Sequence, residues 1–372
     1  MRILVRRSVI YLIVFLISCL LIRAIQLRNS SNHLQSIEIE ISEDVKLNQK
    51  RLIDLKDEFH YILKPNLNFY EVKTRFLGII IIHSYVGHDH LRAKHREAIS
   101  SKELLAFGLK RVFLLSEIPP KERYMTQRAL NNEANRFQDI LQGNFIDAYR
   151  NLTYKHVMGL RFAVTEARDA QFIIKMDDDI VVDFFRIHEM LKNLDQNEQE
   201  YFLKGFVLSD QHVRREKQNK WYVTRDEFAA STYPSYLSGW FYITNIKTAH
   251  DLALASESTP YFWIDDIYVT GILAEELSID REAMNELISS NSEFIDCCLK
   301  DMTNKKLQCS YLIGPNGGDS NLITSFMKAA KKCFLNGCQA RDERHHVRHT
   351  CVAQVKNLLG DRGEPHIQAV RL

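Results

Sequence analysis

The chain lacks an excess of charge of either sign. Its 49 lysines and arginines stand against 47 aspartates and glutamates in 372 residues, which gives a formal net charge of +2. A nucleic-acid-binding face needs a clear cationic excess, so this balance argues against a nucleic-acid-binding protein. Internal repeats and low-complexity tracts are also absent. At this length the chain can bury a core as one large or two ordinary domains, and we expect it to be globular.

Cysteine is nearly missing from the first three quarters of the chain. After Cys19 none occurs before position 297, and no pair has the Cys-x-x-Cys spacing typical of zinc sites. Three histidines near the last cysteines nevertheless keep a metal cluster open as the alternative. An even, clustered set predicts a disulfide framework, whose pairing the sequence leaves undecided. The set consists of Cys297, Cys298, Cys309, Cys333, Cys338 and Cys351, and the histidines are His345, His346 and His349.

One long hydrophobic run stands at the N-terminus, from Val9 to Ile22, and only Ser18 interrupts it. At about 1.5 Å per residue, residues 8–22 span roughly 22 Å as a helix, somewhat less than a bilayer core of about 30 Å. A small-x-small cleavage site is absent before Arg23, and three arginines precede the run, namely Arg2, Arg6 and Arg7. These features predict a cytosolic tail at 1–7 and an uncleaved type II signal-anchor at 8–22, with a cleaved signal peptide as the alternative.

Residues 23–70 are polar and charged, with too few large apolar residues in sustained period to form a core. We interpret this segment as a stem that is partly helical or disordered. Two sequons, Asn29-Ser-Ser and Asn151-Leu-Thr, are candidate glycosylation sites if the body of the protein lies in the lumen.

From residue 71 the sequence predicts an α/β domain. Continuous apolar runs at 76–85, 111–117 and 171–176 are typical of buried parallel strands. Apolar residues with helical period follow at 152–167, and again after Asp183, which is a good helix N-cap. Alternating strands and helices indicate a mainly parallel sheet flanked by helices. We expect this catalytic domain to span 71–285, with a cysteine-rich C-terminal part at 286–372.

Three consecutive acids, Asp177, Asp178 and Asp179, stand where the third predicted strand ends. Ligands of open α/β sheets bind at the carboxyl ends of parallel strands. In extended backbone Asp177 and Asp179 would project to the same face. Carboxylates this close raise each other's pKa unless a cation joins them, and oxygen ligands favour Mg²⁺ or Mn²⁺. The sequence thus predicts a divalent metal site, the alternative being a solvated acidic turn.

A second acidic pair, Asp265 and Asp266, lies between apolar residues ahead of a predicted helix that contains Gly271. A carboxylate at a helix start is stabilised in its ionised form by the helix dipole. Asp266 is therefore a candidate general base, if a substrate hydroxyl comes within about 3 Å. The alternative is a helix N-cap with a solvated neighbour.

Together these motifs resemble the β1,3-galactosyltransferase and β1,3-N-acetylglucosaminyltransferase family, type II Golgi enzymes with a Rossmann-like GT-A fold. The likeness follows the family's order from about residue 85 to residue 280. It is carried by RAKHREAI (92–99), FLL (113–115), FQDILQGNFIDAYRNLTYKHVMGLRF (137–162), FIIKMDDDIVV (172–182), KWYV (220–223), YPSYLSGWFYIT (233–244) and DDIYVTG (265–271).

The resemblance implies an inverting transfer of a sugar, most simply galactose from UDP-galactose, to a hydroxyl of a glycoprotein or glycolipid glycan. It implies Mn²⁺, or Mg²⁺, held by Asp177 and Asp179, with Asp266 as the base. Donor binding would fall to Arg92, Arg96 and Asp178, since guanidinium groups suit phosphates. Acceptor binding would involve Trp221, Tyr222, Tyr236, Gly239, Trp240 and Asp265. The partners implied are a UDP-sugar, a glycan and, through the anchor, the Golgi membrane; nucleic acid is not among them.

Departures from the family pattern keep other hypotheses open. The family supplies a histidine beyond the base as a further metal ligand, and none occurs here between Asp266 and His345; Asn316 stands nearest the expected place. Asp265 replaces the family's glutamate, and Ile99 replaces its tryptophan. The alternatives are a β1,3-N-acetylglucosaminyltransferase, an inactive glycan-binding relative, and a Mg²⁺-dependent phosphohydrolase that uses both acid pairs.

Overall fold

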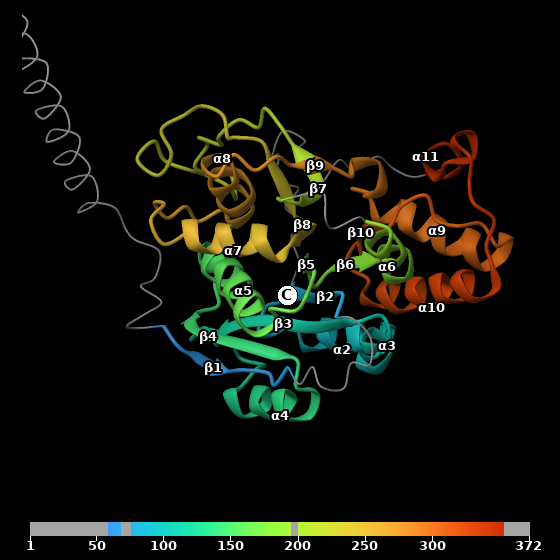
Figure 1. The fold of residues 1–372 in the computed structure, drawn as a ribbon, viewed down its shortest axis with the longest axis horizontal. Helices are drawn as coiled ribbons and strands as arrows, with labels where there is room; N and C mark the ends of the chain where they lie inside the picture. Colours follow the sequence, from blue (N-terminus) through green and yellow to red (C-terminus); the bar gives the residue numbers. More distant parts are fainter. Residues whose placement is uncertain (1–58, 68–75, 195–199, 353–372) are drawn as a thin grey trace, which may run out of the picture. The chain divides into compact units, whose positions relative to one another are not determined.

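The computed structural model describes residues 59–67, 76–194 and 200–352. The described chain is built on an eight-stranded mixed sheet with the strand order β1-β4-β3-β2-β5-β8-β7-β9 (Figure 1). Its centre, from β4 to β5, is parallel, and β1 and β8 join antiparallel at either side. The strands are β1 (Tyr61–Leu63), β2 (Gly78–His83), β3 (Leu109–Glu117), β4 (Ile140–Ile146), β5 (Phe172–Asp177), β7 (Leu203–Leu208), β8 (Tyr236–Asn245) and β9 (Glu282–Ala283).

The strands form where the sequence has continuous apolar runs, because both faces of the sheet are covered. Every residue of β2 is buried, and along it Ile80 and Ile82 enter one core while Ile79 and Ile81 enter the other. This alternation is the period of two that extended backbone imposes. It confirms the prediction of buried parallel strands with helices on both faces.

Helices with apolar stripes cover these two cores. One core is formed with α5 (Leu152–Glu166), α7 (Ile246–Ala255) and the π-helix η3 (Ile267–Leu273). The other is formed with α2 (Asp89–Ala98), α3 (Ser101–Ala106), α6 (Phe184–Lys192), α9 (Ser292–Lys305) and α10 (Ser320–Asn336). A smaller cluster lies under α4 (Gln127–Phe137). The Asp183 side chain accepts a hydrogen bond from the backbone N–H of Arg186, which confirms it as the N-cap of α6.

The C-terminal part is joined to the α/β domain by a second sheet. Strand β10 (Ile313–Pro315) pairs antiparallel with β6 (Ile180–Val182), which directly follows the three acids. Residues of α9 and α10 share one buried core with β2 and β5, and Figure 1 shows both helices beside β6 and β10. The short elements in this part are η4 (Asn285–Leu287), η5 (Glu343–His345) and α11 (Val347–Thr350). Residues on both sides of the boundary expected at 286 therefore belong to one hydrophobic core.

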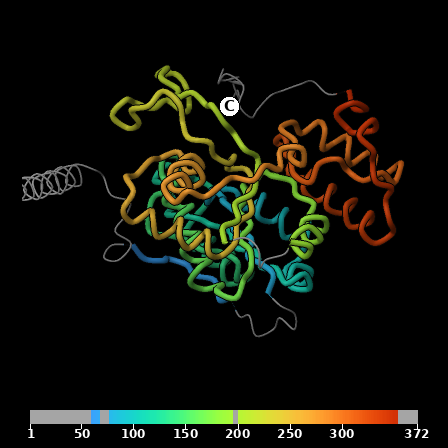
Figure 2. Tube along the Cα trace, turned by 45° about the horizontal axis from the view of Figure 1, so that its top comes forward, coloured from blue at the N-terminus to red at the C-terminus, as the bar shows by residue number. Residues whose placement is uncertain are grey.

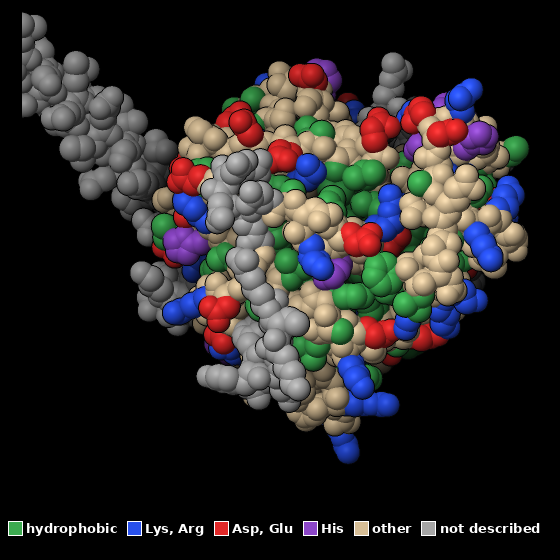
Figure 3. Space-filling model, turned by 45° about the vertical axis from the view of Figure 1, so that its right-hand side comes forward, with side chains coloured by type: hydrophobic (Ala, Val, Ile, Leu, Met, Phe, Trp, Pro, Cys, Tyr) green, Lys and Arg blue, Asp and Glu red, His purple; other side chains and the backbone are tan. Residues whose placement is uncertain are grey.

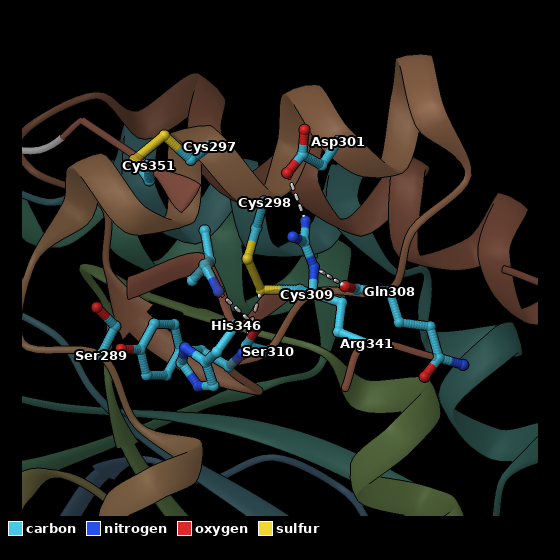
Figure 4. The surroundings of a disulfide bond; sticks show 12 residues. Ser289, Cys297, Cys298, Asp301, Gln308, Cys309, Ser310, Arg341, His346 and Cys351 are labelled. Carbon is cyan, nitrogen blue, oxygen red and sulfur yellow. Dashed lines mark hydrogen bonds and ion pairs between the residues drawn. A yellow bond between two sulfur atoms is a disulfide. The ribbon is translucent and has the colours of Figure 1, made fainter. Parts of the chain in front are cut away.

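All six cysteines of the last quarter of the chain form disulfides, which confirms the predicted framework and leaves no thiolate among them to bind zinc. The pairs are Cys297–Cys351, Cys298–Cys309 and Cys333–Cys338. Figure 4 shows the Cys298–Cys309 bond beside the ion pair of Arg341 with Asp301, whose atoms Nη2 and Oδ2 lie 2.5 Å apart. Arg341 also donates to the Gln308 carbonyl, so one arginine ties the segment after α10 to α9 and to the loop that follows it.

Two expectations concern segment limits. The stem was expected to reach residue 70, but Tyr61–Leu63 pair with β4 as the edge strand of the main sheet, so the folded domain begins earlier. The tail, the signal-anchor and Asn29 lie outside the described residues. In the described parts of the chain, no helix combines the length and apolar character that crossing a bilayer requires.

The surface agrees with the near-zero net charge. On the face drawn in Figure 3, acidic and basic side chains are interspersed around apolar ones. Figure 2 shows the long connection between β7 and β8, residues 209–235, looping out from the sheet. This connection carries Trp221 and Tyr222 of the expected acceptor side.

Replacing both Cys298 and Cys309 with alanine should lower the free energy of unfolding by about 2–4 kcal/mol, because their bond closes a loop and both sulfurs lie in the core. Thermal and denaturant unfolding would measure the loss. The matched control is the Cys333/Cys338 double alanine variant, whose bond closes a shorter loop at half-buried positions. An equal loss in both variants would contradict the core role of Cys298–Cys309.

Candidate functional site

The three acids form a turn between β5 and β6. Asp177 is the last residue of β5, and Asp178 and Asp179 make the turn, so the extended geometry expected through Asp179 is wrong. The turn exposes Asp179, half-buries Asp177 and buries Asp178. As expected, the acids lie at the carboxyl end of a parallel strand, where ligands of α/β sheets bind.

The charge of Asp179 still acts on Asp177. Burial, followed by the charge of Asp179 and opposed by Lys175, raises the pKa of Asp177 to about 7. Partial desolvation by the surrounding turn, followed by the charge of the neighbouring Asp178, raises the pKa of Asp179, although this residue still reaches solvent. Two carboxylates held together in partial burial are relieved by a cation, so this pair fits a divalent ion that prefers oxygen ligands.

Asp178 is occupied within the protein. Its Oδ2 lies 3.0 Å from Nδ1 of His88, and its backbone carbonyl lies 2.8 Å from Nε2 of His95. Both histidines flank or belong to α2, so Asp178 fixes the turn against that helix. The structure therefore gives Asp178 a positioning contact in place of the donor contact expected of it. On the other side, the backbone N–H of Asn316 donates to the Asp179 carbonyl at 2.9 Å.

Asp266 stands at the N-terminus of η3 and faces the start of β8. Its Oδ1 accepts from the backbone N–H of Ile267 at 2.9 Å, and its Oδ2 lies 3.3 Å from the backbone nitrogen of Gly239. A Cβ added at Gly239 would lie 3.3 Å from the Asp266 Cβ, which explains why the residue there is small. Burial and the adjacent charge of Asp265 raise the pKa of Asp266 to about 7. A carboxyl with this pKa is matched to accept a proton near neutral pH.

Asp265 has the opposite electrostatic state. Burial acts to raise its pKa, but the hydrogen bond from His156 and the charge of Lys175 outweigh this and lower the pKa. The Oδ2 of Asp265 lies 2.9 Å from Nδ1 of His156 and 3.9 Å from Nδ1 of His83. The sequence placed Asp265 on the acceptor side, whereas the structure buries it against α5 and β2.

Lys175 joins the two acidic segments. It is fully buried in β5, its Nζ donates to Asp177 Oδ1 at 2.7 Å, and it also donates to the Gly239 carbonyl. Burial acts to lower its pKa, but the charges of Asp177 and Asp265 outweigh this and raise the pKa. Lys175 thus packs its stem in the core and pairs its ammonium group with an aspartate. Acids about ninety positions apart in sequence thus share one buried cation.

Aromatic side chains line the side of the site next to Asp266. Trp221 Nε1 donates to the Tyr149 hydroxyl at 2.8 Å, and the Tyr149 ring contacts that of Trp263 with centroids 5.9 Å apart. Burial raises the pKa of Tyr149, and Asp266, Asp265 and Asp177 raise it further, so this ring lies close to both acid pairs. Trp221 is 39% exposed, so part of its ring is accessible to solvent. Sequence reasoning missed Tyr149 and Trp263, although Tyr149 lies within a stretch that carries the family resemblance.

The other acceptor-side candidates differ in their surroundings. Tyr236 is buried, and burial together with the charge of Asp266 raises its pKa. Tyr222 is half-buried in the β7–β8 connection. Trp240 is half-buried against the core that contains α6, α9 and α10. Gly239 and Tyr236 thus lie at the site, while the contacts of Trp240 are mainly structural.

Arg92 and Arg96 bind acidic residues of the protein itself. The Arg92 side chain is fully buried and makes five hydrogen bonds, two to Glu133 and the others to Ser84, Tyr85 and Val86. Five is the full donor capacity of a guanidinium group. Arg96 binds Glu133 and both carboxylate oxygens of Asp139. The donor contact expected of them is therefore corrected to a positioning role, in which they hold α2 against α4 and β4.

Asn151, the sequon within the described residues, also has structural contacts. Its side-chain amide donates to the Ile146 carbonyl at 2.8 Å, and the buried Thr153 hydroxyl donates to the Phe262 carbonyl at 2.7 Å. Thr153 thereby ties α5 to the segment that leads to Asp265. Glycosylation at Asn151 stays a prediction.

The fold and site together define a class of protein: an α/β protein with an acid pair at the strand ends and a second carboxylate pair next to the aromatic side chains of Tyr149 and Trp221. A family model described as Galactosyltransferase matches residues 92–285. The chain belongs to this family, which confirms both the resemblance and the expected enzyme class, a hexosyltransferase.

Curated relatives agree with this membership. Beta-1,3-galactosyltransferase 5 of Gorilla gorilla gorilla is 28% identical over 240 residues, which cover 61% of this chain and 77% of the relative. Beta-1,3-galactosyltransferase 5 of Homo sapiens is 30% identical and covers 54% of this chain and 64% of the relative. N-acetyllactosaminide beta-1,3-N-acetylglucosaminyltransferase 2 of Mus musculus is 30% identical, and the match covers 54% of this chain and 49% of the relative. The matches thus span about half to three quarters of the relatives' lengths.

Arg92→Met should lower the free energy of unfolding by about 3 kcal/mol, because it leaves Glu133 with one fewer partner and the backbone carbonyls of Tyr85 and Val86 without this donor. Denaturant unfolding measures this effect, and Arg128→Met is the control, since Arg128 is exposed and has no ion pair within the described residues. A variant with unchanged stability and weakened nucleotide binding would instead restore the direct donor role of Arg92.

Proposed function

We propose that the protein is an inverting β1,3-glycosyltransferase that transfers galactose from UDP-galactose to a hydroxyl of a glycoprotein or glycolipid glycan. One observation carries the proposal. Asp266, whose pKa is raised to about 7, and the acid pair Asp177 and Asp179 converge around the buried Lys175. An in-line displacement needs a base and a leaving-group site that are held close to each other, and the shared contact with Lys175 holds the two acidic segments together.

Asp177 and Asp179 would hold Mn²⁺ or Mg²⁺ together with the donor diphosphate. The fit rests on the oxygen-only donor set and on the raised pKa values of the two carboxyls, which a cation would relieve. The bound ion supplies positive charge that stabilises the departing diphosphate. Asp178 and Arg92 serve the donor indirectly, by fixing the turn and α2, and Arg96 secures the same helix through Asp139.

At the acceptor, Asp266 accepts the proton of the attacking hydroxyl. The hydroxyl oxygen forms a bond to the anomeric carbon while the bond from that carbon to the phosphate oxygen of UDP breaks, and its electron pair leaves with UDP. Attack opposite to the leaving group inverts the configuration, which accounts for a β-linked product from an α-linked donor. The backbone N–H of Gly239 and that of Ile267 orient the carboxylate for this step.

The aromatic side chains next to Asp266 are suited to hold the acceptor. Trp221 and Tyr149 present flat apolar faces joined by a hydrogen bond, and Lys220 Nζ lies 4.3 Å from the Tyr149 ring centroid. Sugar rings stack on such faces through their C–H groups. Acceptor binding is thus assigned to Tyr149, Trp221 and Tyr236, with Gly239 giving room beside the base.

The chain is further proposed to reside in the Golgi membrane as a single-pass type II protein, on the basis of the arginine-flanked run at 8–22. A β1,3-N-acetylglucosaminyltransferase activity is the second candidate, supported by the similarity to the mouse N-acetylglucosaminyltransferase. A panel of UDP-sugars and simple acceptors with linkage analysis of the products distinguishes the two donors.

Asp266→Asn should lower kcat by about 100- to 10,000-fold with little change in donor KM, because it removes general base catalysis. In the unmodified enzyme, kcat should rise with pH through about 7, since Asp266 accepts a proton only when ionised and its pKa is about 7. Steady-state kinetics over a pH series measures both. A change confined to donor KM would contradict the base assignment.

Asp179→Ala should abolish metal-dependent transfer without lowering the melting temperature, since Asp179 is exposed. Mn²⁺ titration with UDP, followed by calorimetry, tests the binding directly. Asp169→Ala at the other end of β5 is the matched control, being an equally exposed aspartate. If Asp179→Ala still binds the metal, the assignment of Asp179 as a metal ligand is wrong.

A further inference from the structure

A buried chain of hydrogen bonds leads from Asp265, the neighbour of Asp266, into the core. His156 of α5 lies between Asp265 and Tyr242 of β8, with Nδ1 2.9 Å from Asp265 Oδ2 and Nε2 2.7 Å from the Tyr242 hydroxyl. His156 and Tyr242 are fully buried and Asp265 is 8% exposed. Three elements distant in sequence thus contribute one residue each to a row that ends beside Asp266.

The protonation of this row follows from its chemistry. An ionised carboxylate only accepts hydrogen bonds, so Nδ1 of His156 carries the proton and donates it to Asp265. Nε2 is then the acceptor, and the Tyr242 hydroxyl donates to it. Burial lowers the pKa of His156, which agrees with a neutral ring. Tyr242 therefore selects the tautomer of His156 that can serve Asp265.

Charged and titratable groups surround the row on every side. Lys175 of β5 and Asp266 of the η3 terminus are nearest to Asp265. His83 of β2 packs edge-on against His156 with ring centroids 5.0 Å apart, and burial, Lys175 and His156 lower its pKa well below the usual range. Lys155 of α5 is paired with Asp147 at 2.7 Å. His83 is thus neutral, and Asp265 is the anion that the row serves.

A metal centre is the competing interpretation of this cluster. Single ligand atoms of His83, His156 and Asp265 lie within 4.8 Å of one another. However, the distance of 2.9 Å from His156 to Asp265 is that of a hydrogen bond, and the charge of Lys175 acts on all three residues. A buried cation beside the cluster opposes a second one.

Resting on the proposed function, we propose that His156 and Tyr242 are positioning residues for the base: they hold Asp265 as a carboxylate, whose fixed negative charge makes the adjacent Asp266 a stronger base. Neither residue touches substrate, because both are enclosed in the core. The His156 hydrogen bond stabilises the ionised form of Asp265. Without it, a proton shared by Asp265 and Asp266 moves from Asp266 to Asp265. Asp266 then stays ionised to lower pH but accepts a proton less readily.

The kinetic test uses His156→Leu, Tyr242→Phe and, as a rescue, His156→Gln, whose amide can still donate to Asp265. His156→Leu should lower kcat roughly threefold to tenfold and move the acid-side midpoint of the pH profile down by about one pH unit, with donor KM unchanged. Tyr242→Phe should shift the midpoint the same way by a smaller amount, and His156→Gln should restore most of it. An unchanged midpoint in His156→Leu overturns the inference.

The matched control is Tyr268→Phe. It removes another buried hydroxyl, which donates to the Thr259 carbonyl just beyond the site. Tyr268→Phe should lower thermal stability as Tyr242→Phe does while keeping the pH midpoint. Equal midpoint shifts in the two variants would reduce the role of Tyr242 to general stability and overturn the proposal.

A second measurement separates this inference from the proposed function. Carboxyl titration of the full chain by ¹³C NMR, with Asp266→Asn used for assignment, reads the Asp265–Asp266 pair without any turnover. If no UDP-sugar is consumed, the proposed function fails, but a titration that shifts in His156→Leu still supports the coupling. If transfer occurs and the titration is unaltered, the inference fails alone. The metal content of the purified variants tests the competing interpretation. If Asp179→Ala holds stoichiometric metal and His156→Leu does not, the cluster of His83, His156 and Asp265 binds a metal ion, and the inference is overturned.

Discussion

The buried cation Lys175 organises the candidate site. Lys175 lies in the middle of the sheet, where a lone ammonium group would be strongly disfavoured, and it is stable there because carboxylates from two separate segments approach it. The same arrangement keeps carboxylates close together in partial burial, which is otherwise unfavourable as well. Charge balance around Lys175 therefore fixes the position of the acidic turn relative to β8 and η3, and the two halves of the site are held in register by one interaction.

Much of the fold could be predicted from the sequence because its signals are local. The runs at 76–85 and 171–176 became β2 and β5, and the helical period at 152–167 became α5. Asp183 caps α6 as its type and place suggested. Strand β1 was missed, since three residues in a polar stretch carry little hydrophobic pattern. The π-helix after Asp266 has no signature in the sequence beyond that of any apolar helix.

The acidic residues of the site could be predicted from the sequence, whereas the side chains that contact them could be predicted only in part. Two acidic groups between apolar residues are conspicuous in any sequence, and both lie where ligands are expected to bind. What surrounds each acid depends on tertiary contacts that spacing does not encode. Arg92 was expected to bind phosphate, but its burial against Glu133 depends on α4 packing on α2. His156 lies within the helical stretch predicted at 152–167, and its contact with Asp265 arises only from folding.

The pairing of β6 with β10 places a constraint on how this protein comes to exist. Strand β6 continues directly from the acidic turn, and β10 and Asn316 secure that turn from a segment well over a hundred positions downstream. During synthesis the main sheet can assemble while the turn still lacks this support. The acidic turn then gains its support last, after β10 and Asn316 have docked against it. Under the proposed function, the metal and donor site would therefore be complete only after β10 has paired with β6, and a chain cut short of β10 would lack the support of its acidic turn.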